Sequence, residues 1–399
     1  MRGIMARSIK AKATPALLAW ARNTAGLSLD DAAGKLGKKF RSERLASWEA
    51  GGDQPTIAQL RKLSEIYRRP LAVFYLPSPP YDFPVPHDFR RLPEQGPASY
   101  SPQLRLELRF AHERRQTALM LLEELDEQPQ KFSLHAELLE AAEVVGARAR
   151  AALNVPLDEQ MRWNDAHLAL RSWRAAVENL GVLVFQVSGV DPIEMRGFSI
   201  AEEILPIIAV NRSGRESPRA RSFSLMHELT HLMLRVSSVC DFDDESPRSK
   251  GDLQTEAFCN RVAAAILVPA THFVLQPEIA AHPAKPREWP EEIIGILAGR
   301  YSVSREVIVR KLLIEGRASA GFYRRKRDEY RNQYREWRKA QKGGFEDHGE
   351  KRVRLLGPSF ARLVLETYYN GKMTLSEALG HLGTKVKHLP TIEQTLKAA

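Results

Sequence analysis

The 399-residue sequence is poor in cysteine and has no long apolar run, and both features limit what it can encode. Its two cysteines, Cys240 and Cys259, are too few for a disulfide framework, which is typical of a reducing compartment. No stretch approaches the roughly 18 consecutive apolar residues of a membrane span. The basic N-terminus leads into an apolar segment that Arg22 interrupts too soon for a signal peptide. We therefore expect a cytoplasmic protein with no membrane partner.

Positive charge is concentrated in two parts of the chain. The formal net charge is +10, but residues 1–75 contain 14 Lys and Arg against 6 Asp and Glu, and residues 317–342 contain 10 against 3. The remaining residues are slightly acidic in sum. Two basic segments on a nearly neutral body indicate contact with nucleic acid more than a general aid to solubility.

The length and the pattern of apolar residues predict an α+β, mostly helical protein of two to three domains. Residues 1–76 have the pattern of a four- or five-helix unit, and prolines keep residues 77–100 extended as a linker. Residues 101–316 are expected to form helical cover followed by a small sheet, with strands near 182–187, 196–200 and 206–210. Residues 317–399 are expected to be a basic, helical C-terminal region.

Two short helices joined by a glycine turn give residues 14–76 a helix-turn-helix pattern. The stretches Gly26-Leu27-Ser28 and Ser47-Trp48-Glu49-Ala50-Gly51 resemble the helix-turn-helix of phage-repressor-like (XRE-type) regulators. The resemblance implies a duplex-DNA partner. The residues expected to meet bases and phosphates are Lys38, Lys39, Arg41, Ser42 and Arg44. Glu43 would repel phosphate, so a docking or dimerising role for this unit stays open as an alternative.

The most informative motif is His227-Glu228-Leu229-Thr230-His231, which stands inside an apolar run. Helix positions four apart share one face, so His227 and His231 can present two imidazole nitrogens to one zinc ion. Glu228 lies beside the metal, where it can take a proton from zinc-bound water. Such a motif also arises by chance on surface helices, but the apolar flanks here predict a buried helix. The motif therefore predicts the H-E-x-x-H zinc site of a metallopeptidase, with Glu228 as the base.

Zinc needs at least one more protein ligand besides an open place for water. The long variant of the motif is excluded, because Leu234 and Ser237 stand where Gly and His would be needed. Glu256 lies on a helix predicted from about 252 to 268, and on spacing alone it is either a ligand or a solvated helix carboxylate. Nearer carboxylates lie in a stretch with the composition of a solvated loop, which holds a ligand less firmly: Asp241, Asp243, Asp244 and Glu245.

From about residue 180 to 275, the ordered motifs resemble the ImmA/IrrE family of metallopeptidases. The resemblance rests on Arg219-x-Arg221, on the H-E-x-x-H motif, and on Glu256-x-x-x-Asn260 followed by Ala263-Ala264-x-Ile266-Leu267-x-Pro269. It implies one zinc ion held by His227, His231 and Glu256, with Glu228 as the base. It also implies that the substrate is a regulatory protein such as a repressor. Thr230 and Val262 depart from the usual residues, and neither touches the chemistry.

The leading hypothesis is a cytoplasmic zinc endopeptidase that cleaves a repressor-like or antitoxin-like regulator. Its activity would be coupled to a DNA-binding module in transcriptional, phage or mobile-element, or stress regulation. The alternative is a DNA-binding transcriptional regulator whose metal site is structural or sensory. The developing oxyanion needs a second donor beside zinc, and three residues are candidates by charge alone: Arg90, Arg219 and Arg221.

Overall fold

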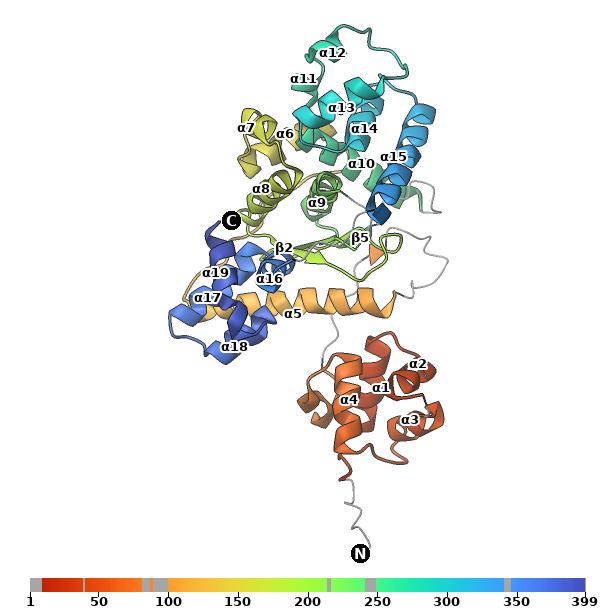
Figure 1. Ribbon diagram of the computed structural model, residues 1–399, viewed down its shortest axis with the longest axis vertical. Helices are drawn as coiled ribbons and strands as arrows, with labels where there is room; N and C mark the ends of the chain where they lie inside the picture. Colours follow the sequence, from red (N-terminus) through yellow and green to blue (C-terminus); the bar gives the residue numbers. More distant parts are fainter. Residues whose placement is uncertain are drawn as a thin grey trace, which may run out of the picture. The chain divides into compact units, whose positions relative to one another are not determined.

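The computed structural model describes residues 9–38, 40–80, 87–88, 100–213, 217–240, 249–340 and 346–398 (Figure 1). The chain divides into two compact units. The first contains residues 1–85 and 98–112, and the second contains residues 86–97 and 113–399. Among the described residues, none of the helices is long and apolar enough to cross a membrane. The finer division at residues 76, 100 and 316 stays a prediction.

The first unit is built from short helices whose ends are fixed by side-chain caps. Ser28 and Thr56 each accept a hydrogen bond from the backbone N–H three residues on, and the side chains of Asp31 and Gln59 accept in return. Trp48 is completely buried at the centre of this unit. The elements are α1 (Pro15–Thr24), α2 (Leu29–Leu36), α3 (Ser42–Glu49), α4 (Ile57–Tyr67) and the 3-10 helix η1 (Leu71–Tyr75). These helices match the four- or five-helix pattern expected for residues 1–76.

The second unit contains a mixed sheet with strand order β1-β5-β3-β4-β2. β2 pairs parallel with β4, β3 pairs antiparallel with both β4 and β5, and β1 pairs parallel with β5. The strands are β1 (His87–Asp88), β2 (Leu183–Val187), β3 (Gly197–Ile200), β4 (Ile207–Asn211) and β5 (Ser238–Cys240). The three predicted strands are confirmed as β2, β3 and β4. The expectation of a solvated loop after Ser237 is wrong for Ser238–Cys240, because pairing with β3 buries these residues.

Helices α8, α9 and α10 form the layer that carries the predicted site. α9 (Pro218–Met233) packs across β3 and β4, with α8 (Ala166–Glu178) and α10 (Lys250–Leu267) against it (Figure 1). α8 begins at Ala166 because Asp165 caps its start by accepting a hydrogen bond from the Leu168 N–H. The preceding helices are α5 (Pro102–Glu124), α6 (Ala142–Leu153) and α7 (Leu157–Arg162).

The chain beyond α10 continues as helices, which confirms a mostly helical α+β fold. Aromatic residues near 322–342 face the core in part, since Tyr323 is buried and Tyr330 packs on the core. The helices are α11 (Ala270–Phe273), α12 (Pro277–Ala280), α13 (Glu291–Arg300), α14 (Arg305–Ile314), α15 (Ala320–Ala340), α16 (His348–Leu356), α17 (Pro358–Tyr369), α18 (Leu375–Leu382), the 3-10 helix η3 (Val386–His388) and α19 (Leu389–Lys397).

Candidate metal centre

Helix α9 presents the H-E-x-x-H motif inside the second unit. Ser217 accepts a hydrogen bond from the Ala220 N–H and Pro218 begins the helix, so its start is well defined. From Arg221 to Met233 every residue of α9 is buried. His227 and His231 are one turn apart, with their Nε2 atoms 3.1 Å from each other and no exposed surface. The predicted pair of imidazoles is therefore on one face of a buried helix.

Glu256 reaches the two imidazoles from α10. Its Oε1 lies 3.1 Å from Nε2 of His231, and its Oε2 lies 3.4 Å from Nε2 of His227. Glu256 is 4% exposed, so it is not the solvated carboxylate that the spacing also allowed. The rival carboxylates at 241, 243, 244 and 245 lie outside the described residues.

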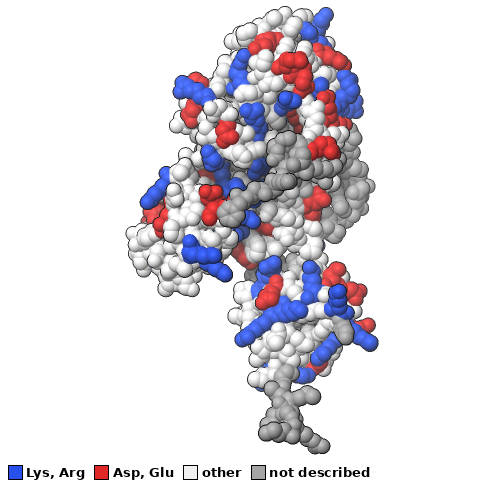
Figure 2. Space-filling model, viewed as in Figure 1, with Lys and Arg blue, Asp and Glu red and all other residues white. Residues whose placement is uncertain are grey.

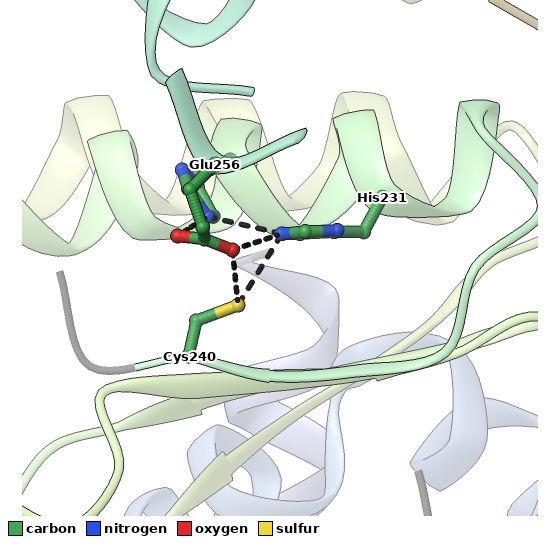
Figure 3. Close-up of side chains that lie close together, drawn as sticks. His231, Cys240 and Glu256 are labelled. Carbon is green, nitrogen blue, oxygen red and sulfur yellow. Dashed lines mark hydrogen bonds and ion pairs between the residues drawn. The ribbon is translucent and has the colours of Figure 1, made fainter. Parts of the chain in front are cut away.

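Cys240 of β5 completes a group of four potential donors, which the sequence had not indicated. Its Sγ lies 3.3 Å from Nε2 of His231 and 3.5 Å from Oε1 of Glu256 (Figure 3). The ligand atoms of His227, His231, Cys240 and Glu256 all lie within 4.8 Å of one another. Figure 3 shows Cys240 pointing from its strand toward Glu256 and His231. Two nitrogens, one oxygen and one sulfur at this spacing fit a single divalent ion such as zinc.

Two of the four donors, His227 and Glu256, have the protonation states that a metal cation requires. Burial lowers the pKa of His227 to about 4, so this imidazole is neutral, as a metal ligand must be. Burial alone would raise the pKa of Glu256, but His227 and His231 beside it hold that pKa well below its usual range. Glu256 therefore brings a negative charge to the buried cluster. Burial raises the pKa of the Cys240 thiol.

Glu228 points from α9 toward the sheet, beside the cluster. Its Oε2 accepts a hydrogen bond of 2.8 Å from Ser238 Oγ, and that hydroxyl is 2.7 Å from Ser199 Oγ. Among the described residues, Oε1 has no hydrogen-bond partner, although it is buried. Burial raises the pKa of Glu228 to about 7. A carboxyl group that titrates near neutral pH is suited to accepting and returning a proton.

Gly197 of β3 leaves the space that the Glu228 side chain occupies. A Cβ at position 197 would lie 2.7 Å from Glu228 Oε1 and 3.0 Å from its Cγ. These distances are too short for any side chain without a shift of the carboxylate. Sequence alone did not indicate this role, because it depends on β3 packing against α9.

The structure describes two of the three arginines considered for oxyanion binding. Arg221 is buried and donates from Nη1 to Gln186 Oε1 on β2 at 3.3 Å. Arg219 is half-buried, and Arg90 lies outside the described residues. A cation that the sequence did not suggest is Arg310 of α14, which lies over the Phe223 ring at 5.4 Å and contributes to the lowered pKa of His227. No local signal could indicate it, since it is far from α9 in sequence.

The residues predicted to bind DNA surround the start of α3. Lys38, Arg41 and Arg44 are exposed, and Ser42, the first residue of the helix, is half-buried. Lys39 lies outside the described residues. The Arg44 guanidinium lies over the rings of Trp48 and Phe40, at 5.6 and 5.8 Å. On the face drawn in Figure 2, the first unit carries several Lys and Arg side chains with acidic ones among them. Their role in binding stays a prediction.

The family comparison covers the part of the chain that holds this centre. The family model described as IrrE N-terminal-like domain (Peptidase_M78) matches residues 177–313. No curated protein matches the chain. The matched stretch includes β2 to β5, α9 and α10, and therefore all four donors and Glu228. Fold, cluster and match together support a metallopeptidase-type function for the second unit. More particularly, the match supports the ImmA/IrrE family, whose peptidases depend on a metal.

Proposed function

We propose that the chain is a zinc-dependent endopeptidase that cleaves a regulatory protein of the repressor or antitoxin kind, in transcriptional, phage or mobile-element, or stress regulation. The observation that carries this proposal is Glu228. It is a buried carboxyl group with a pKa near 7, placed next to a His-His-Glu cluster and held by a serine hydroxyl. A site that only held a metal would have no use for such a base.

Each residue of the site has a separate role in the proposed reaction. His227, His231 and Glu256 would hold the zinc ion, which supplies Lewis acidity to the peptide carbonyl and to water. Ser238 holds Oε2 of Glu228, so Oε1 is the oxygen available for a proton. Glu228 accepts the proton of the attacking water at Oε1 and then returns it to the leaving amine. Burial of the base keeps bulk water from competing for this proton.

Replacing Glu228 by Gln tests this proposal. We expect Glu228→Gln to retain zinc and the fold but to lower cleavage by about 10²–10⁴-fold or more, since only the base is removed. The chain would be co-expressed with proteins encoded by neighbouring genes, and the proteins that disappear only when Glu228 is intact would be identified. Glu124→Gln, an exposed change of the same kind, is the control. Cleavage at the unaltered rate by Glu228→Gln would contradict the mechanism.

We further propose that residues 14–76 bind duplex DNA through the start of α3. The exposure of Lys38, Arg41 and Arg44 there supports the proposal. Arg41→Ala in the full chain should weaken binding and reduce the salt dependence by about one phosphate contact, while Arg61→Ala on α4 should change both less. Gel shifts at several salt concentrations measure both quantities. No retention of duplex DNA even at low salt would favour the docking or dimerising alternative.

A second function is favoured by Cys240. Four protein donors around one metal are typical of a structural site, whereas catalytic zinc usually has three. The chain would then be a DNA-binding regulator with a structural or sensory metal. The Glu228→Gln experiment separates the two, because a structural site would tolerate that change without loss of function.

A further inference from the structure

Cys240 is fixed in its place by the sheet. It pairs with Gly197 of β3, and its carbonyl oxygen accepts a hydrogen bond of 2.9 Å from the Arg196 N–H. Only 1% of the residue is exposed. Cys240 and Cys259, both within the described part of the chain, are free thiols. The position of the Cys240 Sγ beside the cluster is thus set by backbone pairing and does not depend on a bond to a second cysteine.

The distances from Cys240 match those between ligands of one zinc ion. Zinc–nitrogen, zinc–oxygen and zinc–sulfur bonds of about 2.0–2.3 Å, arranged tetrahedrally, separate the ligand atoms by about 3.3–3.6 Å. Sγ lies 3.3 Å from His231 Nε2 and 3.5 Å from Glu256 Oε1. Nε2 of His227 and Nε2 of His231 are 3.1 Å apart, and Glu256 reaches them with different oxygens, Oε1 at 3.1 Å from His231 and Oε2 at 3.4 Å from His227. All four ligand atoms lie within 4.8 Å of one another, so sulfur can occupy the fourth corner, and thiolate is a ligand that zinc accepts readily.

We propose that Cys240 is a fourth protein ligand that closes the metal site, so that the peptidase is latent until this thiolate leaves the metal. The inference rests on the proposed zinc peptidase function, because it assigns a state to the same site. A zinc ion with four protein ligands has no open position for the attacking water. Departure of Cys240 returns the site to three protein ligands and one open position, which is the arrangement that hydrolysis requires.

Strand β5 carries both Cys240, which would close the metal site, and Ser238, which holds the base Glu228. Side chains two residues apart on a strand point to the same face, and Ser238, which holds Glu228, is two residues before Cys240. β5 has only three residues, and its ladder with β3 spans positions 197–199. A displacement of this short strand would therefore remove Cys240 from the metal and would change the Ser238–Glu228 hydrogen bond at the same time.

Cobalt substitution of the full chain tests the proposal directly, because a thiolate bound to Co²⁺ absorbs in the near ultraviolet. We expect this band in the unaltered protein and in Cys259→Ala, and its loss in Cys240→Ala with cobalt still bound. Cys259, the other buried thiol, interacts with the His231 imidazole, so Cys259→Ala shows which of the two thiols gives the band. If the site is open in about 1–10% of molecules, Cys240→Ala should cleave about 10–100-fold faster.

The unaltered protein supplies a second readout in case Cys240→Ala does not fold. Bound zinc should slow alkylation of Cys240 by iodoacetamide relative to the chelated protein, with Cys259 as the internal reference in the same mass spectrum. Bound cobalt without a thiolate band, or a band that depends on Cys259, would overturn the proposal and leave the peptidase function standing. Absence of cobalt binding, or binding unchanged by His227→Ala, would overturn the proposed function as well.

Discussion

Gly197 shows how one missing side chain positions the base. Gly197→Ala would put a Cβ 2.7 Å from Glu228 Oε1, so the carboxylate must move away. A misplacement of about 1 Å can cost about 10²-fold in rate, and we expect a loss of that order with metal content unchanged. Gly251→Ala, where the nearest atom would be 3.9 Å away, is the control. Peptidase activity and metal content would be measured for both variants. Full activity in Gly197→Ala would show that Glu228 acts from another position.

Ser238 should set the pH at which Glu228 becomes a base. Its hydrogen bond favours the ionised carboxylate and lowers the pKa of Glu228, whereas burial raises that pKa. Ser238→Ala should therefore raise the pKa of Glu228 further. As the solution is acidified, the variant should lose the ionised carboxylate, and with it activity, at a higher pH than the unaltered protein. The acid limb of the pH–rate profile should move upward relative to the unaltered protein. An unchanged acid limb would show that Ser238 does not control the pKa of Glu228.

The residues of the site differ in how far sequence could predict them. His227, Glu228 and His231 follow from helical spacing, whereas spacing left Glu256 as either a ligand or a solvated carboxylate, and the family resemblance implied that it is a ligand. Cys240 and Ser238 reach the site only because β5 pairs with β3. Three residues, Ser-Val-Cys, carry no period that distinguishes a strand from a loop. Strand pairing is a non-local event, and sequence reasoning therefore missed both.

At the scale of elements, the fit between α6 and α10 should control the metal site. A Cβ at Gly146 of α6 would lie 2.6 Å from the Cβ of Ala265 on α10. Gly146→Ala should force the helices apart and cost about 1–3 kcal/mol of unfolding free energy. Because α10 carries Glu256, zinc affinity should fall as well.

Gly295 of α13 provides the matched comparison, because a Cβ there would meet nothing within 4 Å. Gly295→Ala should be neutral or stabilise by up to about 1 kcal/mol, since alanine favours the helix. Denaturant unfolding with a zinc titration measures both variants. Equal stability and zinc affinity in the two would show that the contact between α6 and α10 does not position Glu256.

The same contrast between local and non-local information explains the fold prediction. Local side-chain caps fix the starts of helices in the first unit, and β-branched runs were enough to predict β2 and β4. The break between α7 and α8 has no such signal, because the apolar pattern continues through Trp163 while the cap at Asp165 restarts the helix. Caps inside an apolar period carry too little signal to be recognised from sequence alone.

For the whole molecule, metal removal should affect one unit and spare the other. The four donors come from α9, α10 and β5, so a bound ion ties together three elements of the second unit. The first unit has its own buried core around Trp48, Tyr67 and Phe74. Free zinc at 100 times its dissociation constant should stabilise the second unit by about 2.7 kcal/mol. Chelation should therefore lower one calorimetric transition and leave the other in place.

The His227→Ala variant is the control for this measurement, because a chain that cannot bind the ion should show no change on chelation. The unfolding of the full chain would be followed by calorimetry with and without zinc. Duplex DNA should raise the transition temperature of the first unit only, so its addition shows which transition belongs to which unit. Two transitions that shift together on chelation would mean that the units do not unfold independently. An unshifted thermogram in the unaltered protein would mean that the cluster binds no ion strongly enough to stabilise the fold.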